Sequence, residues 1–195
     1  MSPLDNLYKY EVLLASASPR RRELLAQLNI DFEIAPSIDI DESYPSSMVA
    51  TEVAPHLSLL KANAYKDLIT NNQLIITADT VVINDGKVLG KPASKQEAFD
   101  MLKSLSGHIH SVVTGVSITT AYQQITFSAD TQVEFAPIED DEIKWYVDHF
   151  SPLDKAGAYG IQEWIGCIGI RNINGSYYNV MGLPLHRLYC ELKKF

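Results

Sequence analysis

A turn from strand to helix near the start of the chain gives the first indication of the fold class. Residues 10–23 read Y-E-V-L-L-A-S-A-S-P-R-R-R-E. The apolar run at residues 10–15 predicts a short buried strand. Ser18 followed by Pro19 is typical of a helix start, because a hydroxyl caps the first free N–H groups and proline has no N–H to leave unpaired. We therefore expect a buried strand that leads directly into a helix.

Strand-like and helix-like patterns alternate along the rest of the chain. Further strands are predicted at residues 32–35, 74–77, 81–83, 109–120 and 125–135, with hairpin turns at residues 84–86 and between strands 165–172 and 177–180. Further helices are predicted from Pro55 to about residue 68, at residues 94–105 and 140–150, and from residue 183 to residue 194. This alternation predicts an α/β fold with a mixed twisted sheet and flanking helices.

The composition is that of an ordinary globular protein, and the charge balance narrows the classes of function that fit the chain. The chain has 24 acidic and 16 basic residues, and its net charge of −8 disfavours a protein that tracks nucleic acid. A local cluster of cations can still bind a small anion. No apolar run approaches the roughly 20 residues that cross a bilayer, and the first residues lack a signal-peptide pattern. We therefore expect a cytoplasmic protein without membrane or nucleic-acid partners, in which Cys167 and Cys190 are reduced and buried.

The strand-to-helix turn also holds the first candidate site. Ser16, Ser18, Arg20 and Arg21 lie in it, and residues 20–22 are all arginine. Cations in the first turn of a helix are unfavourable, because that end already carries partial positive charge. This pattern indicates that an anion fills the site, where backbone N–H groups, hydroxyls and guanidinium groups would bind phosphate. A solvated basic helix end is the alternative.

Acidic residues form a second group. Asp39, Asp41 and Glu42 occupy a polar loop, and Asp79 interrupts an apolar run at residues 75–82. Mg²⁺ takes one or two carboxylates together with substrate phosphate oxygens. A buried charge is unfavourable without a partner, so a metal or a cation is expected near Asp79. The alternatives are a turn or bulge residue at Asp79 and a solvated loop for the other three.

Two lysines and a glycine-rich segment complete the candidate site. Lys61 lies on a predicted helix, and Lys91 lies in a loop between glycine and proline. Each is either a point charge for phosphate or an ordinary surface lysine. Residues 154–162 read D-K-A-G-A-Y-G-I-Q, and small residues let backbone approach a ligand closely. Gln162 could offer a donor and an acceptor to a base edge, and a plain loop is the alternative.

Other signatures of phosphate or metal sites are weak or absent from the sequence. His108 and His110 share a strand face at a spacing that could hold a metal, but without a third ligand we expect ordinary strand or turn histidines. The sequence contains neither G-x-x-x-x-G-K-[ST] nor G-x-G-x-x-G. Any phosphate chemistry must therefore use another scaffold.

Taken together, these stretches resemble the Maf family of nucleotide pyrophosphatases, historically described as septum-formation inhibitors, over almost the whole chain. The matching stretches are residues 14–21, 41–43, 61–62, 78–80, 90–92, 105–108, 154–162 and 182–185. So many matches in one order are specific, whereas S-x-S-P-R alone is only moderately so. One small departure is that residues 57–60 read L-S-L-L, where many members have a more polar helix.

The resemblance implies a single Maf-like domain over residues 1–195, with two lobes around a nucleotide-binding cleft in a Maf/ITPase-like fold. It also implies release of pyrophosphate from nucleoside triphosphates with a divalent metal, Mg²⁺ or else Mn²⁺ or Co²⁺, and it allows a homodimer. Asp79 matches the residue taken as the base that activates water. Arg20, Thr80 and Gln162 match positions that help set the preferred base, and in these the chain resembles the subgroup acting on dTTP and UTP.

A mechanism follows from the residues and the resemblance together. Glu42 and Asp79 would hold the metal, which neutralises phosphate charge and positions the water. The predicted substrate-binding residues are Ser16, Ser18, Arg20, Arg21, Lys61, Thr80, Lys91 and Gln162. The role of Asp79 as base, metal ligand or both stays open at this point. Two other classes also stay open: a nucleotide-binding regulator of cell division without turnover, and a nucleotidyltransferase.

Overall fold

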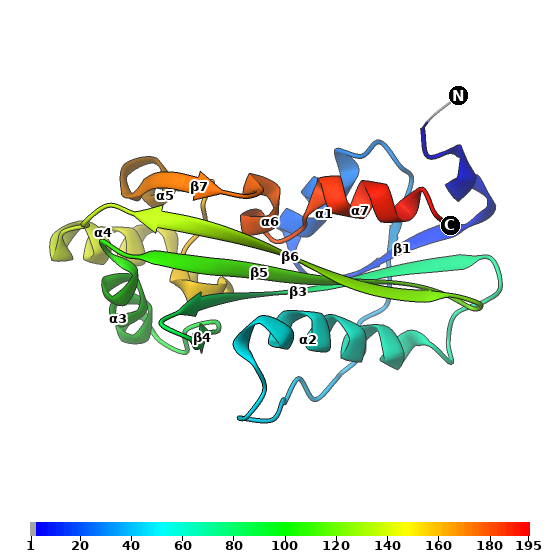
Figure 1. Ribbon diagram of the computed structural model, residues 1–195, viewed down its shortest axis with the longest axis horizontal. Helices are drawn as coiled ribbons and strands as arrows, with labels where there is room; N and C mark the ends of the chain where they lie inside the picture. Colours follow the sequence, from blue (N-terminus) through cyan, green and yellow to red (C-terminus); the bar gives the residue numbers. More distant parts are fainter. Residues whose placement is uncertain (1–2) are drawn as a thin grey trace. The chain divides into compact units, whose positions relative to one another are not determined.

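The structure of the protein is a computed structural model that describes residues 3–195 (Figure 1). Its strands are β1 Glu11–Ala15, β2 Glu33–Ile34, β3 Gln73–Asn84, β4 Lys87–Leu89, β5 Ile109–Thr120, β6 Gln124–Phe135 and β7 Ile170–Asn174. Its α-helices are α1 Pro19–Ala26, α2 Ala50–Tyr65, α3 Lys95–Leu105, α4 Asp140–Phe150, α5 Trp164–Gly169, α6 Tyr177–Met181 and α7 Leu185–Leu192. Short 3-10 helices are η1 Asp5–Lys9, η2 Pro152–Asp154 and η3 Ala156–Ala158. Among the described residues, no helix is both long and apolar enough to span a bilayer.

The strands form a mixed sheet. Their hydrogen-bonded order is β2-β1-β3-β5-β6-β7, and β4 pairs with β3 beside this path. β1 is parallel to both β2 and β3, whereas the β3–β4 and β6–β7 pairs are antiparallel. Helices alternate with these strands along the chain. The predicted α/β fold with a mixed sheet and flanking helices is confirmed.

The chain divides into two compact units. Unit 1 comprises the described chain up to Asp79, together with Thr114–Ala129 and Gly182–Phe195. Unit 2 comprises Thr80–Val113 and Asp130–Met181. The first boundary falls inside β3, directly after Asp79. Two units agree with the two expected lobes, whereas the single domain and the nucleotide-binding cleft stay predictions.

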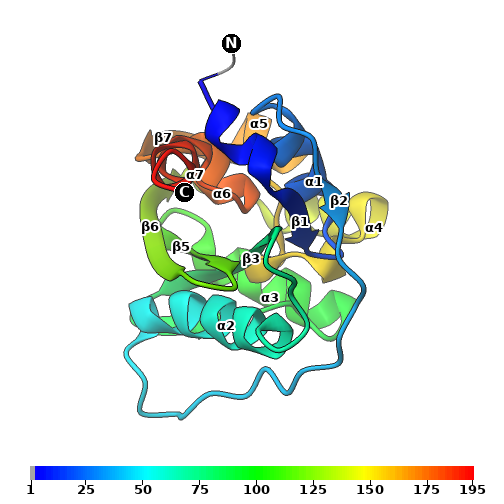
Figure 2. The same ribbon diagram turned by 90° about the vertical axis from the view of Figure 1, so that its right-hand side faces the viewer.

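In unit 1 helices cover both faces of the sheet. Figure 2 shows α2 on one side of the strands and α7 on the other. A parallel strand covered on both faces needs a continuous apolar run, and Val12, Leu13 and Leu14 of β1 are accordingly all buried. On α1, Leu24 and Leu25 are fully buried. The strand-to-helix unit predicted from residues 10–23 is confirmed.

Helix α2 begins at Ala50, and the prediction that Pro55 opens it is wrong. Val53 and Ala54 are fully buried, so packing stabilises the turn ahead of the proline. Val49 at the N-cap has no side chain that caps the helix, which leaves no start signal in the sequence. Pro55 removes one hydrogen bond near the helix start, and the packed helix tolerates this loss.

Strand β3 is continuous through residues that the sequence divides into two apolar runs. Asp79 therefore lies inside a strand and not at a turn or strand end. At the far end of β3, Asp85 and Gly86 have φ values of 48° and 75°, the left-handed conformation that a tight hairpin turn requires. The predicted turn at residues 84–86 is confirmed by the β3–β4 pairing.

In unit 2, α3 and α4 pack together against the sheet residues of that unit. Leu102, Phe135 and Tyr146 belong to its core and are almost completely buried. Ser94 caps α3 as predicted, because its hydroxyl accepts from the N–H of Glu97 at 3.1 Å. These two helices position the loop between α4 and α5, in which residues 154–162 lie.

The predicted hairpin of residues 165–172 and 177–180 is wrong in both arms. Most of the first arm belongs to α5, β7 follows it and pairs with β6, and the second arm belongs to α6. Short apolar runs do not distinguish strands from buried helices. At Gly166, α5 packs directly onto the preceding backbone. A Cβ atom at this position would lie 1.9 Å from the carbonyl oxygen of Ile161.

Gly115 of β5 sets the contact between this strand and α2 within unit 1. A Cβ atom at Gly115 would lie 2.3 Å from the backbone nitrogen of Pro55 and 2.4 Å from the carbonyl oxygen of Ala54. We expect Gly115→Ala to lower the free energy of unfolding by about 3 kcal/mol or more, because helix and strand must separate to admit the methyl group. Gly90→Ala is the matched control, since a Cβ atom there meets nothing within 4 Å. Equal urea denaturation midpoints for the two variants would contradict the prediction.

Candidate functional site

The start of α1 is stabilised by its own serines. The hydroxyl of Ser16 accepts from the N–H of Ser18 at 3.2 Å, and the hydroxyl of Ser18 accepts from the N–H of Arg21 at 3.5 Å. Both bonds hold the turn in the shape that a helix N-terminus needs. The predicted helix start is confirmed, and the predicted phosphate contacts of Ser16 and Ser18 stay predictions.

Arg21 does not lie on the surface of this turn. Its Nε donates to the carbonyl oxygen of Gly182 and its Nη1 to the carbonyl oxygen of Ala78, each at 2.8 Å. Burial lowers the pKa of the Arg21 guanidinium from its usual value, and the nearby Asp79 carboxylate opposes this shift. Arg21 therefore ties the start of α1 to the strand residue that precedes Asp79. This anchoring contact was not predicted from the sequence.

Asp79, Lys61 and Glu42 form a chain of ion pairs in unit 1. The Nζ of Lys61 lies 2.6 Å from Oδ1 of Asp79 and 2.9 Å from Oε2 of Glu42. The side chains of Asp79 and Lys61 are only 15% and 16% exposed, whereas that of Glu42 is 51% exposed. A charge this deeply placed is costly without a partner. The structure thus brings together three of the predicted site residues, and the cation expected near Asp79 is Lys61.

These two carboxylates also fit a divalent metal. In residues 3–195 no group of three or more His, Cys, Asp or Glu side chains converges on one point. Glu42 and Asp79 nevertheless converge on one cation, the Lys61 ammonium. Mg²⁺ needs only one or two protein carboxylates when substrate oxygens and water supply the rest. The donor set therefore suits Mg²⁺ bound together with a phosphate ligand.

The remaining predicted residues lie in unit 2. Lys91 is exposed and follows Gly90, whose carbonyl oxygen accepts from the N–H of Gly157 at 3.0 Å. Gln162 is also exposed, and Thr80 is the first residue of this unit. The Gly90–Gly157 bond joins the loop of Lys91 to the glycine-rich segment. Unit 2 therefore places two of the predicted stretches, residues 90–92 and 154–162, beside each other.

Sequence reasoning missed the side chains that hold the glycine-rich segment. Tyr146 of α4 contacts both Gly160 and Glu163, and Lys155 pairs with Glu163. Tyr146 lies outside the glycine-rich segment, on α4, where its sequence position is typical of a residue on the core-facing side of a helix. Lys155 did carry a signal, because a lysine among alanine and glycine residues next to apolar positions suggests a buried cation with a partner.

The two histidines do not form a metal site. His108 is exposed, and its Nδ1 lies 2.8 Å from the carbonyl oxygen of Ser106. His110 is buried, its Nε2 lies 2.8 Å from the hydroxyl of Tyr159, and its ring packs edge-on against Phe135. Burial lowers the pKa of His110 to about 4, so the ring is neutral near pH 7. His108 lies just before β5 and His110 within it, as expected of turn and strand histidines.

The expectation that both cysteines are buried is wrong. Both are free thiols, but Cys167 is exposed and Cys190 is partly exposed. Cys167 lies in α5, a helix where a strand was predicted from the sequence.

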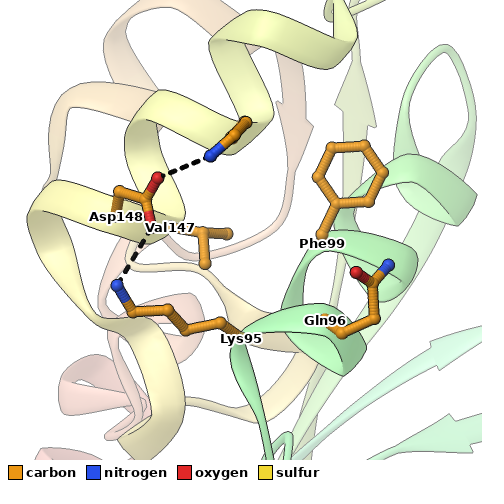
Figure 3. A pocket seen from close by; sticks show the side chains of 6 residues that line it. Lys95, Gln96, Phe99, Val147 and Asp148 are labelled. Atoms are coloured by element: carbon orange, nitrogen blue, oxygen red, sulfur yellow. Dashed lines mark hydrogen bonds and ion pairs between the residues drawn. The ribbon is translucent and has the colours of Figure 1, made fainter.

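A surface depression of about 270 Å³ lies between α3 and α4 of unit 2, apart from the predicted residues (Figure 3). Its lining residues are Lys95, Gln96, Phe99, Lys144, Val147 and Asp148. Hydrogen bonds from Lys95 and Lys144 hold the pKa of Asp148 down at about 2. The charged groups here pair with each other, as in many solvent-exposed ion pairs.

Arg21 and Arg20 provide a test of the anchoring contact. Arg21→Ala is expected to lower the free energy of unfolding by about 2–4 kcal/mol, because two backbone carbonyls lose charge-assisted donors. Arg20→Ala removes a cation from the positive end of α1, where it opposes the helix dipole, so it should lower that free energy less than Arg21→Ala does and weaken anion binding. Urea denaturation of the two apo variants checks both expectations, and equal destabilisation would show that Arg21 is not the anchor.

Comparisons with known proteins agree on the family. The family model for "Maf-like protein" matches residues 11–195. A Bacteroides thetaiotaomicron protein named dTTP/UTP pyrophosphatase is 51% identical over 191 residues, which cover 98% of this chain and 99% of that protein. A Parabacteroides distasonis protein of the same name is 53% identical and matches 98% of this chain over its own full length.

Solved structures resemble the chain in fold at low sequence identity. The Staphylococcus aureus Ham1 protein has a TM-score of 0.57 at 16% identity, covering 94% of this chain and 98% of that one. A HAM1 protein from Coxiella burnetii has a TM-score of 0.51 at 17% identity, covering 95% and 100%. This likeness concerns the fold, whereas the family model and the relatives share the sequence itself. The chain is a member of the Maf-like protein family.

Proposed function

We propose that this protein hydrolyses dTTP and UTP to the nucleoside monophosphate and pyrophosphate. Two relatives that carry this name are 51% and 53% identical over nearly the whole chain. The observation that carries the proposal is the cluster of Asp79, Lys61 and Glu42, because it gathers two carboxylates and a cation at a partly open position. Hydrolysis of a phosphoanhydride needs these groups: carboxylates for metal and water, and cations for the phosphate charge.

Asp79 and Glu42 are the residues that would hold the divalent metal, Mg²⁺ or else Mn²⁺ or Co²⁺. When bound, the metal would neutralise phosphate charge and lower the pKa of a coordinated water. Asp79 can also accept the proton of the attacking water, since a carboxylate within hydrogen-bond reach serves as a general base. Its rigid place inside β3 suits this role, because a strand holds the side chain more precisely than a loop does.

The cations of the site have different roles. Lys61 balances the two carboxylates and offers its ammonium to the phosphates of the substrate. Arg20, Ser16 and Ser18 lie at the start of α1, where N–H groups and the helix dipole favour a phosphate group. Arg21 acts by holding this helix start against the strand of Asp79. Lys91, Thr80 and Gln162, which lie in unit 2, are proposed as further nucleotide-binding residues.

The direct test is pyrophosphate release from a panel of nucleoside triphosphates with Mg²⁺, Mn²⁺ or Co²⁺. We expect release from dTTP and UTP, with much slower release from CTP and GTP. Binding without release under all three metals would favour a nucleotide-binding regulator, and transfer of the nucleotide to an acceptor other than water would favour a nucleotidyltransferase. Sedimentation of the same sample decides whether the protein is a homodimer.

Asp79→Asn is expected to lower kcat by at least about a hundredfold, because the amide keeps the shape and loses the charge that metal and water need. The protein should remain folded, since Lys61 keeps Glu42 as a partner. Asp85→Asn is the matched control: it makes the same chemical change in the exposed β3–β4 turn, which accepts asparagine well. Near-normal pyrophosphate release by folded Asp79→Asn would disprove the catalytic assignment.

Gln162→Leu is expected to reduce the preference for UTP over CTP by about ten- to a hundredfold. Uracil and thymine present O4 as an acceptor beside N3–H as a donor, and a glutamine amide matches both. A wrong base leaves buried polar groups unpaired, which costs about 1–3 kcal/mol for each group. The measurement is the ratio of kcat/KM for the two nucleotides. The control is Gln96→Leu, which makes the same change at an exposed position of α3. Selectivity that survives Gln162→Leu means that another group reads the base.

A further inference from the structure

The turn that carries Gln162 has a defined shape. The N–H of Glu163 donates to the carbonyl oxygen of Gly160 at 3.0 Å, which places Ile161 and Gln162 at the two corners of the turn. Ile161 is buried in the core of unit 2, whereas Gln162 is exposed. The turn thus uses one corner as an anchor and presents the other corner, with its amide, to the outside.

A single hydroxyl group contacts both ends of this turn. The hydroxyl of Tyr146 accepts from the N–H of Gly160 at 3.1 Å and donates to Oε2 of Glu163. Tyr146 is fully buried on α4, so the packed core holds the position of its hydroxyl. Burial and the bond to Glu163 both raise the pKa of Tyr146, so it remains a donor throughout the working pH range.

Lys155 completes the contact on the other oxygen of Glu163. Its Nζ lies 3.2 Å from Oε1 of Glu163 and 2.7 Å from Oδ1 of Asp154, and the lysine side chain is only 8% exposed. A buried ammonium and a partly buried carboxylate stabilise each other where either alone would be costly. The Glu163 carboxylate is therefore held from two sides, by Tyr146 and by Lys155.

The carboxylate of Glu163 and the amide of Gln162 lie against the same face of Gly160. A Cβ atom built on Gly160 would lie 2.8 Å from Cδ of Glu163 and 3.0 Å from Nε2 of Gln162. An ionised carboxylate only accepts hydrogen bonds. It attracts the N–H₂ end of a neighbouring amide and repels its oxygen. The amide nitrogen of Gln162 is indeed the end that lies over Gly160.

We propose that Tyr146, Glu163 and Lys155 are positioning residues that orient the Gln162 amide and so set the preference for uracil and thymine over cytosine. This inference rests on the proposed function, in which Gln162 reads the base. Cytosine presents a donor where uracil presents O4, and an acceptor where uracil presents N3–H. To pair with cytosine the amide must turn over, which would place its oxygen against the Glu163 carboxylate. The held carboxylate therefore disfavours the orientation that cytosine requires.

Tyr146→Phe tests the proposal by removing only the hydroxyl that holds Glu163. We expect the ratio of kcat/KM for UTP to that for CTP to fall about tenfold. This is the effect expected when one hydrogen-bonding group is misplaced. A purely structural role would lower both rates together and leave their ratio unchanged. Glu163→Gln, which keeps the shape and removes the charge, should lower the ratio similarly. It also supplies the same readout if the tyrosine variant does not fold.

Tyr159→Phe is the matched control. Tyr159 lies in the same segment, and its buried hydroxyl bonds to His110 and not to either end of the turn. This variant loses a buried hydrogen bond of the same kind, so urea denaturation should show a loss of stability while the UTP-to-CTP ratio stays within about twofold of that of the unmodified protein. An equal fall in the ratio for Tyr159→Phe would overturn the proposal, since general loosening of the segment would then explain the effect.

A double-substitution cycle separates this inference from the proposed function. In a Gln162→Leu background, Tyr146→Phe should leave the ratio unchanged, because no amide remains to be oriented. If Gln162→Leu alone lowers the ratio but Tyr146→Phe and Glu163→Gln do not, the positioning role is overturned and the base-reading role of Gln162 stands. If Gln162→Leu leaves the ratio unchanged, the base-reading role fails and the positioning role fails with it.

Discussion

A carboxylate in the middle of a buried strand is stable only beside a cation, and the contact between Asp79 and Lys61 meets this need at 2.6 Å. The two residues come from β3 and α2, so the ion pair also fixes which part of the helix lies beside the strand. Gly115 allows the close approach of that helix, because its missing side chain leaves room for the backbone at Pro55. Arg21 then fixes the start of α1 to the residue before Asp79. These contacts of unit 1 thus centre on Asp79, whose side chain is largely shielded from solvent.

Unit 2 uses the same physical principle for a different purpose. There the buried charge is Lys155, and its partner Glu163 is shared with the hydroxyl of Tyr146. The pair lies beneath a turn and not inside a strand, so it orients an exposed side chain instead of presenting its own charge. Buried polar groups that are fully paired give a defined geometry. In both units the paired charge makes the position of a neighbouring group definite.

The sequence predicted those parts of the fold whose signals are local and long. The helices α1, α3 and α4 carry caps that act within a few residues, and β5 and β6 are long runs of strand-forming residues. The errors lie where packing overrides local pattern. Pro55 looks like a helix start, but burial of Val53 and Ala54 extends α2 ahead of it. The short apolar run of α5 looks like a strand, but it forms a helix that packs closely against the backbone of Ile161.

The residues of the candidate site also fall into two groups: those with a local sequence signal and those whose contacts depend on the fold. Asp79 and Lys61 could be predicted because a charge inside an apolar run stands out in any sequence. Arg21 was placed in the right turn, yet its contacts with Gly182 and Ala78 depend on residues that only the fold brings near. Tyr146 could not be found at all, since a tyrosine on the inner face of a helix is typical of a core. Its function depends on the hydroxyl alone, and no local pattern shows where a hydroxyl points.

The charge balance around Asp79 couples the proposed metal to the proposed substrate. Arg21 lies close enough to Asp79 and Glu42 for their charges to affect its pKa, and Lys61 contacts both carboxylates directly. Arg20 affects the same pKa, so this group holds three cations and two anions, and its net attraction for a triphosphate is modest in a protein whose net charge is −8. A divalent cation would make the group more positive, and a bound triphosphate would in turn add oxygen ligands for that cation. Each then raises the affinity of the site for the other, because coupling between two ligands is reciprocal. If the proposed metal binds Asp79 and Glu42, we therefore expect the proposed nucleotide to bind more tightly in its presence.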